Sequence, residues 1–294
     1  MERRAAERRG WNGVWPDRVA PGVGPHRYSV PVPPGDSVQR HAQDFRGQEA
    51  AVDSHFGALD ELETLASAHR FFEWIVGEFS EAIGEQVVEV GAGLGTVSRT
   101  IARLHPNSEV LSLEPAANVF PRLVERLAQD QRVTARHITS AELVESEPDR
   151  RFDTVLYVNV LEHIEHDVDE LCVGARLLKP TGRLCVFVPA MPGLYSRIDA
   201  KSGHYRRYTK RTLRHALERA GFVVDRIDYF DVVSAFPYWL VYRVLRVENL
   251  GSGSNTLFDR VLVPLSRVIQ KVLRHPPFGK NLIATAHLPH PTAF

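Results

Sequence analysis

The sequence predicts an α/β protein with a doubly wound, mostly parallel sheet of seven strands and an inserted helical lid. The first observation is the stretch 87–90, three apolar β-formers interrupted by one carboxylate, which is typical of a buried parallel strand. A glycine turn over 91–95 follows directly and leads into a helix that opens at Thr96. The second observation is that six further β-rich runs alternate with helical segments, as repeated β-α units do.

The other strands are expected at regular intervals along the chain, over 109–114, 132–138, 152–158, 183–189, 222–229 and 281–287. Before the first strand, apolar residues recur every three or four positions over 55–83 and predict a helix. We expect one of its aromatic residues, Phe71, Phe72 or Trp74, to line a ligand pocket. A second helix is expected to start at Pro115 and Ala116, and a third to span 210–220.

The chain divides into three regions. Residues 1–54 are rich in Pro, Gly and Arg without a sustained period, and we expect an irregular arm. The sheet core takes 55–233 and 278–294, and the segment 234–277 is far longer than a hairpin requires. It contains an amphipathic run over 257–274. Our first interpretation of this run is a helix that packs on the core or forms a lid. A dimer face and a membrane-surface helix are the alternatives.

The composition limits which partners the protein is expected to bind and in which compartment it is expected to lie. The net charge of zero argues against nucleic acid as a partner. Cys172 and Cys185 both lie in apolar surroundings, so we expect neither a disulfide framework nor a zinc cluster. The chain has no run of about 18 apolar residues and no apolar run near Met1. We therefore expect a reduced, cytoplasmic protein.

The glycine turn is the strongest motif. Its glycines at 91, 93 and 95 allow a ligand to approach the backbone, and the helix that follows completes a nucleotide cradle. A dinucleotide fingerprint, G-x-G-x-x-G, would need glycine at 96, where this chain has Thr96. An acid, Glu89, stands two residues before the first glycine. The spacing thus argues against NAD(P).

The string E-x-G-x-G-x-G resembles motif I of the class I S-adenosylmethionine (SAM) dependent methyltransferases. Further strings over 113–115, 153–155, 159–165, 178–180, 203–210 and 277–284 follow in the order of a bacterial group that methylates small molecules. The resemblance covers residues 68–289. It implies a Rossmann-like fold, SAM as the cofactor and S-adenosylhomocysteine as the product.

The cofactor is expected at the carboxyl ends of the first four strands, where ligands of open α/β sheets gather. Glu114, at the tip of the second strand, can accept both hydroxyls of a ribose. The resemblance places Asn159 near the methionine end. The full set of expected cofactor residues is Glu89, Gly91, Ala92, Gly93, Gly95, Glu114, Pro115, Thr139, Ser140, Asn159 and Val160.

Methyl transfer to a hydroxyl needs alignment and a base that takes the acceptor proton. The candidate bases are His163 and His204, because imidazole titrates near neutral pH. Glu162 and Tyr208 complete the expected catalytic set. For His163, a buried ring that packs on the helix cap is the alternative.

A pair such as Glu162-His163 with a distal His204 also resembles the metal site of quinone-pathway O-methyltransferases and plant small-RNA methyltransferases. Those sites carry E-x-x-E-H, whereas this chain has Asn159 in place of the first glutamate. The substitution removes charge that an ion would need. We therefore predict no metal, with a divalent ion at these three residues as the alternative.

The acceptor pocket is expected to form from 190–208, the insertion and the arm. Its candidate residues are Tyr195, Asp199, Tyr205, Arg206, Arg207 and Trp239. Arg206 and Arg207 could clamp a phosphate or carboxylate, and their tyrosine neighbours suggest that one of them points inward.

Together these features predict methylation of a small, apolar or amphipathic acceptor, such as a natural product, lipid or quinone-like molecule, with O-methylation first. One alternative is a SAM-fold protein that catalyses a cyclisation or rearrangement without methyl transfer. Another is a non-catalytic, membrane-peripheral SAM-binding protein. We expect no nucleic-acid partner, and leave peripheral membrane contact and a homodimer open.

Overall fold

The structure is a computed structural model that describes residues 55–244 and 258–289. The expected arm over 1–54 lies outside the described residues, as do 245–257 and 290–294. No helix of the described part is long and apolar enough to cross a membrane.

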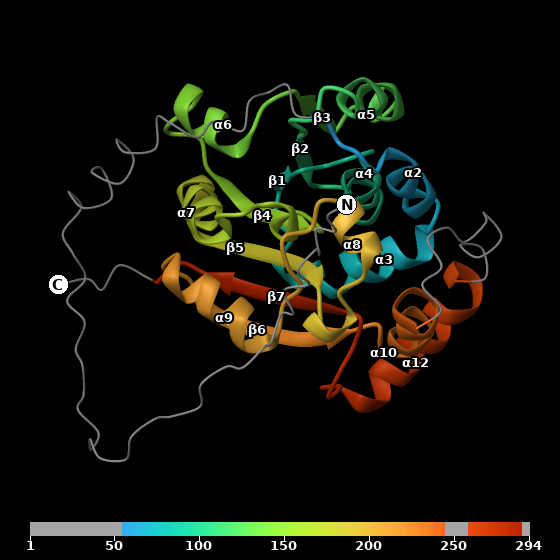
Figure 1. The fold of residues 1–294 in the computed structure, drawn as a ribbon. Coiled ribbons are helices and arrows are strands. Elements are labelled where there is room, and N and C mark those ends of the chain that lie inside the picture. Colours follow the sequence, from blue (N-terminus) through green and yellow to red (C-terminus); the bar gives the residue numbers. More distant parts are fainter. Residues whose placement is uncertain (1–54, 245–257, 290–294) are drawn as a thin grey trace, which may run out of the picture. The chain divides into compact units, whose positions relative to one another are not determined.

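Seven strands form one sheet in the order β3-β2-β1-β4-β5-β7-β6 (Figure 1). They are β1 (Gln86–Val90), β2 (Glu109–Leu113), β3 (Val133–Arg136), β4 (Phe152–Val158), β5 (Leu178–Pro189), β6 (Val223–Phe230) and β7 (Asn281–His287). β7 runs antiparallel to both of its neighbours, and the pairs among β1 to β5 are parallel. This confirms the predicted mostly parallel, doubly wound sheet.

Helices cover both faces of the sheet (Figure 1). One face carries α3 (His69–Glu78), α4 (Thr96–Leu104), α5 (Phe120–Leu127) and α12 (Val263–Leu273), and the other carries α6 (Ser140–Ser146), α7 (Asp167–Leu177) and α9 (Lys210–Arg219). Because successive side chains of a strand point to opposite faces, Val87 packs with the first group and Val88 with the second. Both are fully buried, which contributes about 1.5–3 kcal/mol for each side chain.

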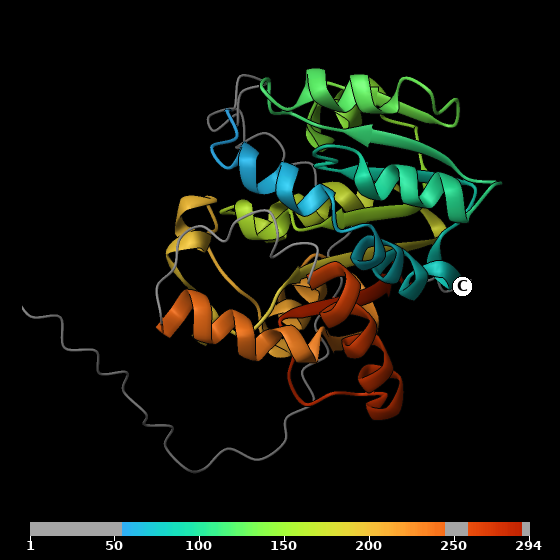
Figure 2. The ribbon, with the colours of Figure 1, turned by 90° about the vertical axis from the view of Figure 1, so that its right-hand side faces the viewer.

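The strand order places a binding crevice between β1 and β4. From β1 the chain builds outward through β2 to β3, and it then returns to add β4 and β5 on the other side. The connections therefore diverge at the carboxyl ends of β1 and β4, where ligands of open α/β sheets bind. Figure 2 shows α2 (Leu59–Ala66, blue) and α8 (Arg197–Lys201, gold) beyond this end of the sheet.

Short helical turns complete the described fold. They are η1 (Ser80–Ala82), η2 (Leu161–His163), η3 (Pro192–Leu194), α10 (Val232–Tyr238), η4 (Trp239–Val244) and η5 (Phe258–Leu262). α10, η4, η5 and α12 occupy the described part of the expected insertion. Its role as a lid stays a prediction.

Two expected helices differ from the structure. The run 55–83 is not one helix, because the chain breaks at Ser67 and Ala68 between α2 and α3. α5 begins at Phe120 rather than at 115, because the Glu114 carboxylate accepts the backbone N–H of Ala116 and holds that segment in a turn.

Candidate active site

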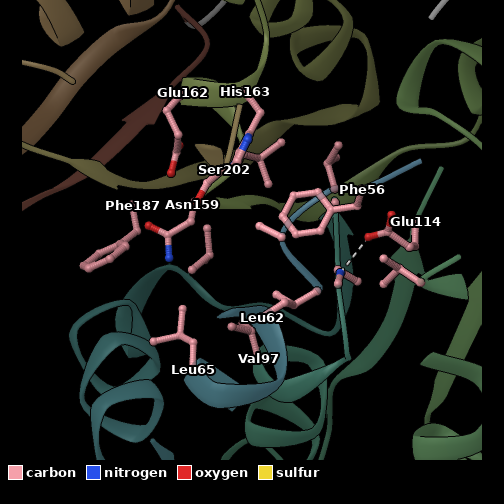
Figure 3. Close-up of a pocket in the computed structure, with 18 of the residues that line it drawn as sticks. Phe56, Leu62, Leu65, Val97, Glu114, Asn159, Glu162, His163, Phe187 and Ser202 are labelled. Atoms are coloured by element: carbon pink, nitrogen blue, oxygen red, sulfur yellow. Dashed lines mark hydrogen bonds between the residues drawn. The ribbon is translucent and has the colours of Figure 1, made fainter. Parts of the chain in front are cut away.

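A cavity of about 630 Å³ lies at the carboxyl ends of the strands (Figure 3). One part, here the glycine-turn side, is lined by residues 89–94 and 96–97, by 113–116 and by 138–140. The other part, here the histidine side, is lined by Glu162, His163, Ile164, Ile198, Asp199, Ser202, His204, Arg207, Tyr238, Lys280 and Asn281. The crevice predicted by the strand order is therefore a real cavity with two chemically different parts.

The glycine turn needs its glycines for steric reasons. Gly91 and Gly95 have φ of +67° and +73°, which side chains rarely adopt. A Cβ on Gly91 would lie 2.7 Å from Val160, and one on Gly95 would lie 2.8 Å from Leu123. Gly95 caps α4 and does not line the cavity, whereas the other ten expected cofactor residues do.

Two buried carboxyl groups face the glycine-turn side. Burial raises the pKa of Glu89 to about 8, and the Ser98 hydroxyl, which donates to this carboxyl group, only partly offsets the rise. Burial also raises the pKa of Glu114. The two Glu114 oxygens each accept one backbone N–H, from Gly93 and from Ala116, both at 2.8 Å. A carboxylate has about four acceptor positions, so Glu114 can still accept from a ligand.

Thr139 and Ser140 line the cavity, but their hydroxyls are used within the protein. Thr139 caps α6 by pairing with Glu142. The Ser140 hydroxyl donates to Glu170 at 2.6 Å. At the end of β4, Asn159 has φ of +54°, and its amide points into the cavity (Figure 3).

On the histidine side, η2 positions Glu162 and His163. Glu162 is 1% exposed, points into the cavity (Figure 3) and has an oxygen, Oε2, without a partner in the described residues. Burial raises its pKa to about 8. Burial and the neighbouring His204 lower the pKa of His163 to about 4. The His163 and His204 rings meet edge to face, with centroids 4.5 Å apart.

Asp199 holds the histidine side together. Its Oδ1 accepts from His204 Nδ1 at 3.0 Å and from Arg207 Nε at 2.7 Å, and its Oδ2 accepts from the Ser196 backbone and hydroxyl. Donors from Ser196, His204 and Arg207 hold the pKa of Asp199 well below its usual range despite burial. Because both oxygens are occupied, Asp199 positions its neighbours; it also lines the cavity, and its role as an acceptor contact stays a prediction.

Glu162, His163 and His204 come together in space, with candidate ligand atoms within 4.8 Å of one another. The buried oxygen of Glu162 without a partner would fit a ligand role. Asp199 on His204 Nδ1 resembles the carboxylate that commonly orients a metal-bound histidine. Asn159 offers only a neutral oxygen beside them, so the set has one ionisable carboxyl group.

Of the two arginines, Arg207 points inward. It lines the cavity, is 7% exposed and donates to Asp199, to the Ala190 carbonyl and to the Tyr238 hydroxyl. Arg206 lies outside the lining and pairs with Asp167 at 3.0 Å. One of the pair is therefore inward, as the sequence suggested, but its guanidinium is already engaged.

Four other expected site residues also lie outside the cavity lining. The hydroxyl of Tyr208 donates to Asp167 at 2.7 Å, and that of Tyr195 donates to the His204 carbonyl at 2.7 Å. Tyr205 and Trp239 are 56% and 41% exposed. These groups are either bonded elsewhere or at the surface, so the cavity lining does not support their catalytic and acceptor roles, which stay predictions together with that of Arg206.

Several lining residues were not among the predicted site residues. Apolar walls come from Phe56, Leu62, Leu65 and Phe187, which surround the cavity in Figure 3. Phe71 and Phe72 line it too, as expected for aromatic residues of this helix. Lys280 and Asn281 enter from the start of β7, and the Asn281 Nδ2 has no partner in the described residues. The string 277–284 was the signal for these two, but its position in space was not predictable.

Comparison with known proteins agrees with this geometry. A family model of methyltransferase domains matches residues 88–184. The demethylmenaquinone methyltransferase of Tropheryma whipplei (strain Twist) is 37% identical over 103 residues, which are 35% of this chain and 41% of the relative. The ubiquinone biosynthesis O-methyltransferase of Ruegeria pomeroyi is 30% identical over 133 residues, 42% of this chain and 51% of the relative. The chain thus spans about half the length of these relatives or less.

Among solved structures, the mitomycin 7-O-methyltransferase MmcR is similar in fold. It superposes with a TM-score of 0.50 at 16% sequence identity, over 76% of this chain and 54% of that one. The matched domain runs from β1 into β5 and contains the glycine turn, Glu114 and Asn159. The domain match and the relatives show a methyltransferase domain over residues 88–184, and the sheet that contains it has the fold of a solved methyltransferase.

Proposed function

We propose that this chain transfers a methyl group from SAM to a small, apolar or amphipathic acceptor, with a hydroxyl oxygen as the first candidate atom. The observation that carries the proposal is the single cavity that joins the glycine turn and Glu114 to the His204–Asp199 pair. The names of the quinone-pathway relatives support an acceptor with oxygen functions on an apolar body.

The glycine-turn side suits SAM. The backbone of Gly91 and Gly93 lines the cavity, and Glu114 retains acceptor positions for the ribose hydroxyls. Glu89 and Asn159 would lie toward the methionine end, with Ala92, Pro115, Thr139, Ser140 and Val160 as further lining. When bound, SAM supplies an electrophilic methyl group on a sulfonium.

On the histidine side, His204 is our candidate for the general base. The Asp199 carboxylate accepts from Nδ1, so this nitrogen carries the proton and Nε2 is the one that can accept another. Asp199 also keeps the ring in place through its fixed position between Ser196 and Arg207. The base would take the acceptor hydroxyl proton as the methyl group is transferred.

The acceptor would lie against the apolar walls that Phe71, Phe72 and Phe187 provide. The methyltransferase fold and the apolar lining favour a small molecule over nucleic acid as the substrate. Cys172 and Cys185 are both free thiols, which supports a reducing, cytoplasmic location. The insertion, as a lid, a dimer face or a membrane contact, would govern access.

We propose that the reaction needs no metal, because Asn159 leaves the cluster of Glu162, His163 and His204 short of charge. Full activity after incubation with EDTA would support this. Loss of activity that added Mg²⁺ or Mn²⁺ restores would instead assign an ion to these three residues.

The test combines calorimetry with mass spectrometry of products. We expect SAM to bind the purified chain, NADH not to bind, and a panel of phenols and hydroquinones to include an acceptor that gains one CH₂. His204→Ala should retain SAM binding and lose at least 100-fold in turnover, whereas the exposed His166→Ala should lose neither. An isomerised product of unchanged mass would favour the cyclisation alternative. Absence of SAM binding would refute the proposal.

A further inference from the structure

The helical segment 258–274, here the outer helix, packs on the core with polar side chains. η5 and α12 form it, at the side of the molecule that Figure 2 turns toward the viewer. Ser266 is fully buried, and its Oγ accepts the backbone N–H of Val233 at 3.2 Å. Gln270 is 6% exposed, and its Oε1 accepts the backbone N–H of Asp231 at 3.2 Å. Only Val263 is a buried apolar side chain between Phe258 and Leu273.

The apolar stripe of the outer helix faces away from the core. Val261, Leu265, Val268 and Val272 are 50%, 48%, 62% and 78% exposed. Their spacing of four, three and four residues places them on one face of a helix. An ordinary surface helix buries its apolar stripe against the core, whereas this helix exposes its apolar stripe and packs with polar side chains. An exposed stripe of this kind points to a partner that covers it.

A basic stripe runs beside the apolar one. Arg260, Arg267 and Lys271 are exposed and again share one face by spacing, and the exposed Arg274 follows directly after the end of α12. None of them forms a side-chain hydrogen bond or ion pair with the residues that the structure describes. The segment 260–274 contains no Asp or Glu. The nearest acid in the sequence, Asp259, accepts the backbone N–H groups of Arg70 and Phe71.

The apolar and basic stripes together indicate which of three candidate partners covers the exposed apolar face: a second copy, the core of this chain or a lipid surface. A second copy of the chain would bring its own four cations to the contact, with no carboxylate in residues 260–274 of either copy to meet them. Packing on the core is excluded for the stripe, because Ser266 and Gln270 occupy that side. An anionic lipid surface satisfies both stripes together, with headgroups for the cations and acyl chains for the valines and leucine.

We propose that the outer helix binds the surface of a membrane that contains anionic lipids, lying in the plane of the interface. The helix does not line the cavity, so the two functions can be separated by mutation. An apolar acceptor dissolved in the same membrane would then reach the cavity at high local concentration. That consequence rests on the proposed methyl transfer, whereas the lipid contact itself does not.

Sedimentation with vesicles tests the proposal on the full chain. We expect binding to vesicles of equal parts phosphatidylcholine and phosphatidylglycerol, weak binding to phosphatidylcholine alone, and release by salt. Arg267→Gln with Lys271→Gln should weaken partitioning about 30-fold, since each basic residue contributes about a factor of five. Val268→Ser with Val272→Ser should weaken it at least about tenfold. Both pairs are exposed, so the fold should survive.

The matched control is Arg211→Gln with Arg214→Gln, which removes the same charge from exposed positions of α9. This variant should bind vesicles like the wild type. Equal binding of all variants, or no binding of the wild type, would overturn the proposal. So would a dimer in sedimentation velocity that Val268→Ser with Val272→Ser dissociates, because the partner would then be a second copy. SAM calorimetry on the same samples reports separately on the proposed enzymatic function.

Discussion

Replacing Glu89 by Gln should make the protein more stable at alkaline pH. Glu89 is 2% exposed, and burial raises its pKa from the ordinary 4.5 to about 8. The folded protein therefore keeps a proton that the unfolded chain releases between these two values. Below the pKa that Glu89 has in the unfolded chain, the wild type keeps its full stability. It loses stability as the pH rises toward the pKa that Glu89 has in the folded protein. Gln carries no charge in either state and avoids this loss.

The magnitude follows from the two pKa values. One unit of pKa difference corresponds to about 1.36 kcal/mol, so the penalty on the wild type should grow by about 3 kcal/mol between about pH 5.5 and about pH 8.5. The Ser98 hydroxyl can still donate to the Gln carbonyl oxygen, so the variant should lose little packing or hydrogen bonding.

Urea unfolding without SAM, followed by circular dichroism at several pH values, measures this difference. Glu85→Gln is the control, because it removes the same charge from an exposed position just before β1. The free-energy difference between Glu89→Gln and the wild type should increase with pH, and that for Glu85→Gln should stay nearly constant. A pH-independent difference for Glu89→Gln would refute the argument that desolvation keeps this carboxyl group protonated.

Two further predictions concern stability. Gly95→Ala should cost about 2–4 kcal/mol in urea unfolding, because φ is +73° and the new Cβ would press on Leu123; Gly77→Ala, in a helix with open space around it, should cost nothing. Arg207→Met should cost about 3–5 kcal/mol, since it leaves the buried Asp199 without its arginine. Arg206→Met, whose pair with Asp167 is partly exposed, should cost less than about 1 kcal/mol by the same measurement. Equal losses in either pair would contradict the assigned packing.

The sequence predicted the features that depend on short stretches of chain. The glycine turn, the start of α4 at Thr96 and the limits of β7 all follow from local apolar patterns and glycine spacing, and the structure agrees with them. The start of α5 was wrong by several residues, because a side-chain bond from Glu114 to Ala116 decides it. Propensity alone does not contain that bond.

Which of two neighbouring side chains enters the cavity could not be predicted. Arg206 and Arg207 are identical in type, and only the buried position of Asp199 and the hydroxyl of Tyr238 distinguish them. The outer helix presents the same difficulty. Periodicity identified its apolar stripe, but the direction of that stripe depends on Ser266 and Gln270 finding backbone donors near α10.

Electrostatics on the histidine side further separates the candidate bases. Among the described residues no cation bonds to Glu162, and its raised pKa keeps it protonated near neutral pH, where it can donate but cannot take a proton. Asp199 is equally buried, yet Arg207 and His204 bond to it directly, and it stays ionised. Asp199 is therefore the charged one of these two carboxyl groups, and it already orients His204. His163 is neutral but a weak base, because burial lowers its pKa to about 4. For the methyl transfer that we propose, His204 Nε2 is therefore our candidate acceptor of the hydroxyl proton, and loss of this nitrogen should cost more turnover than loss of the Glu162 carboxyl group.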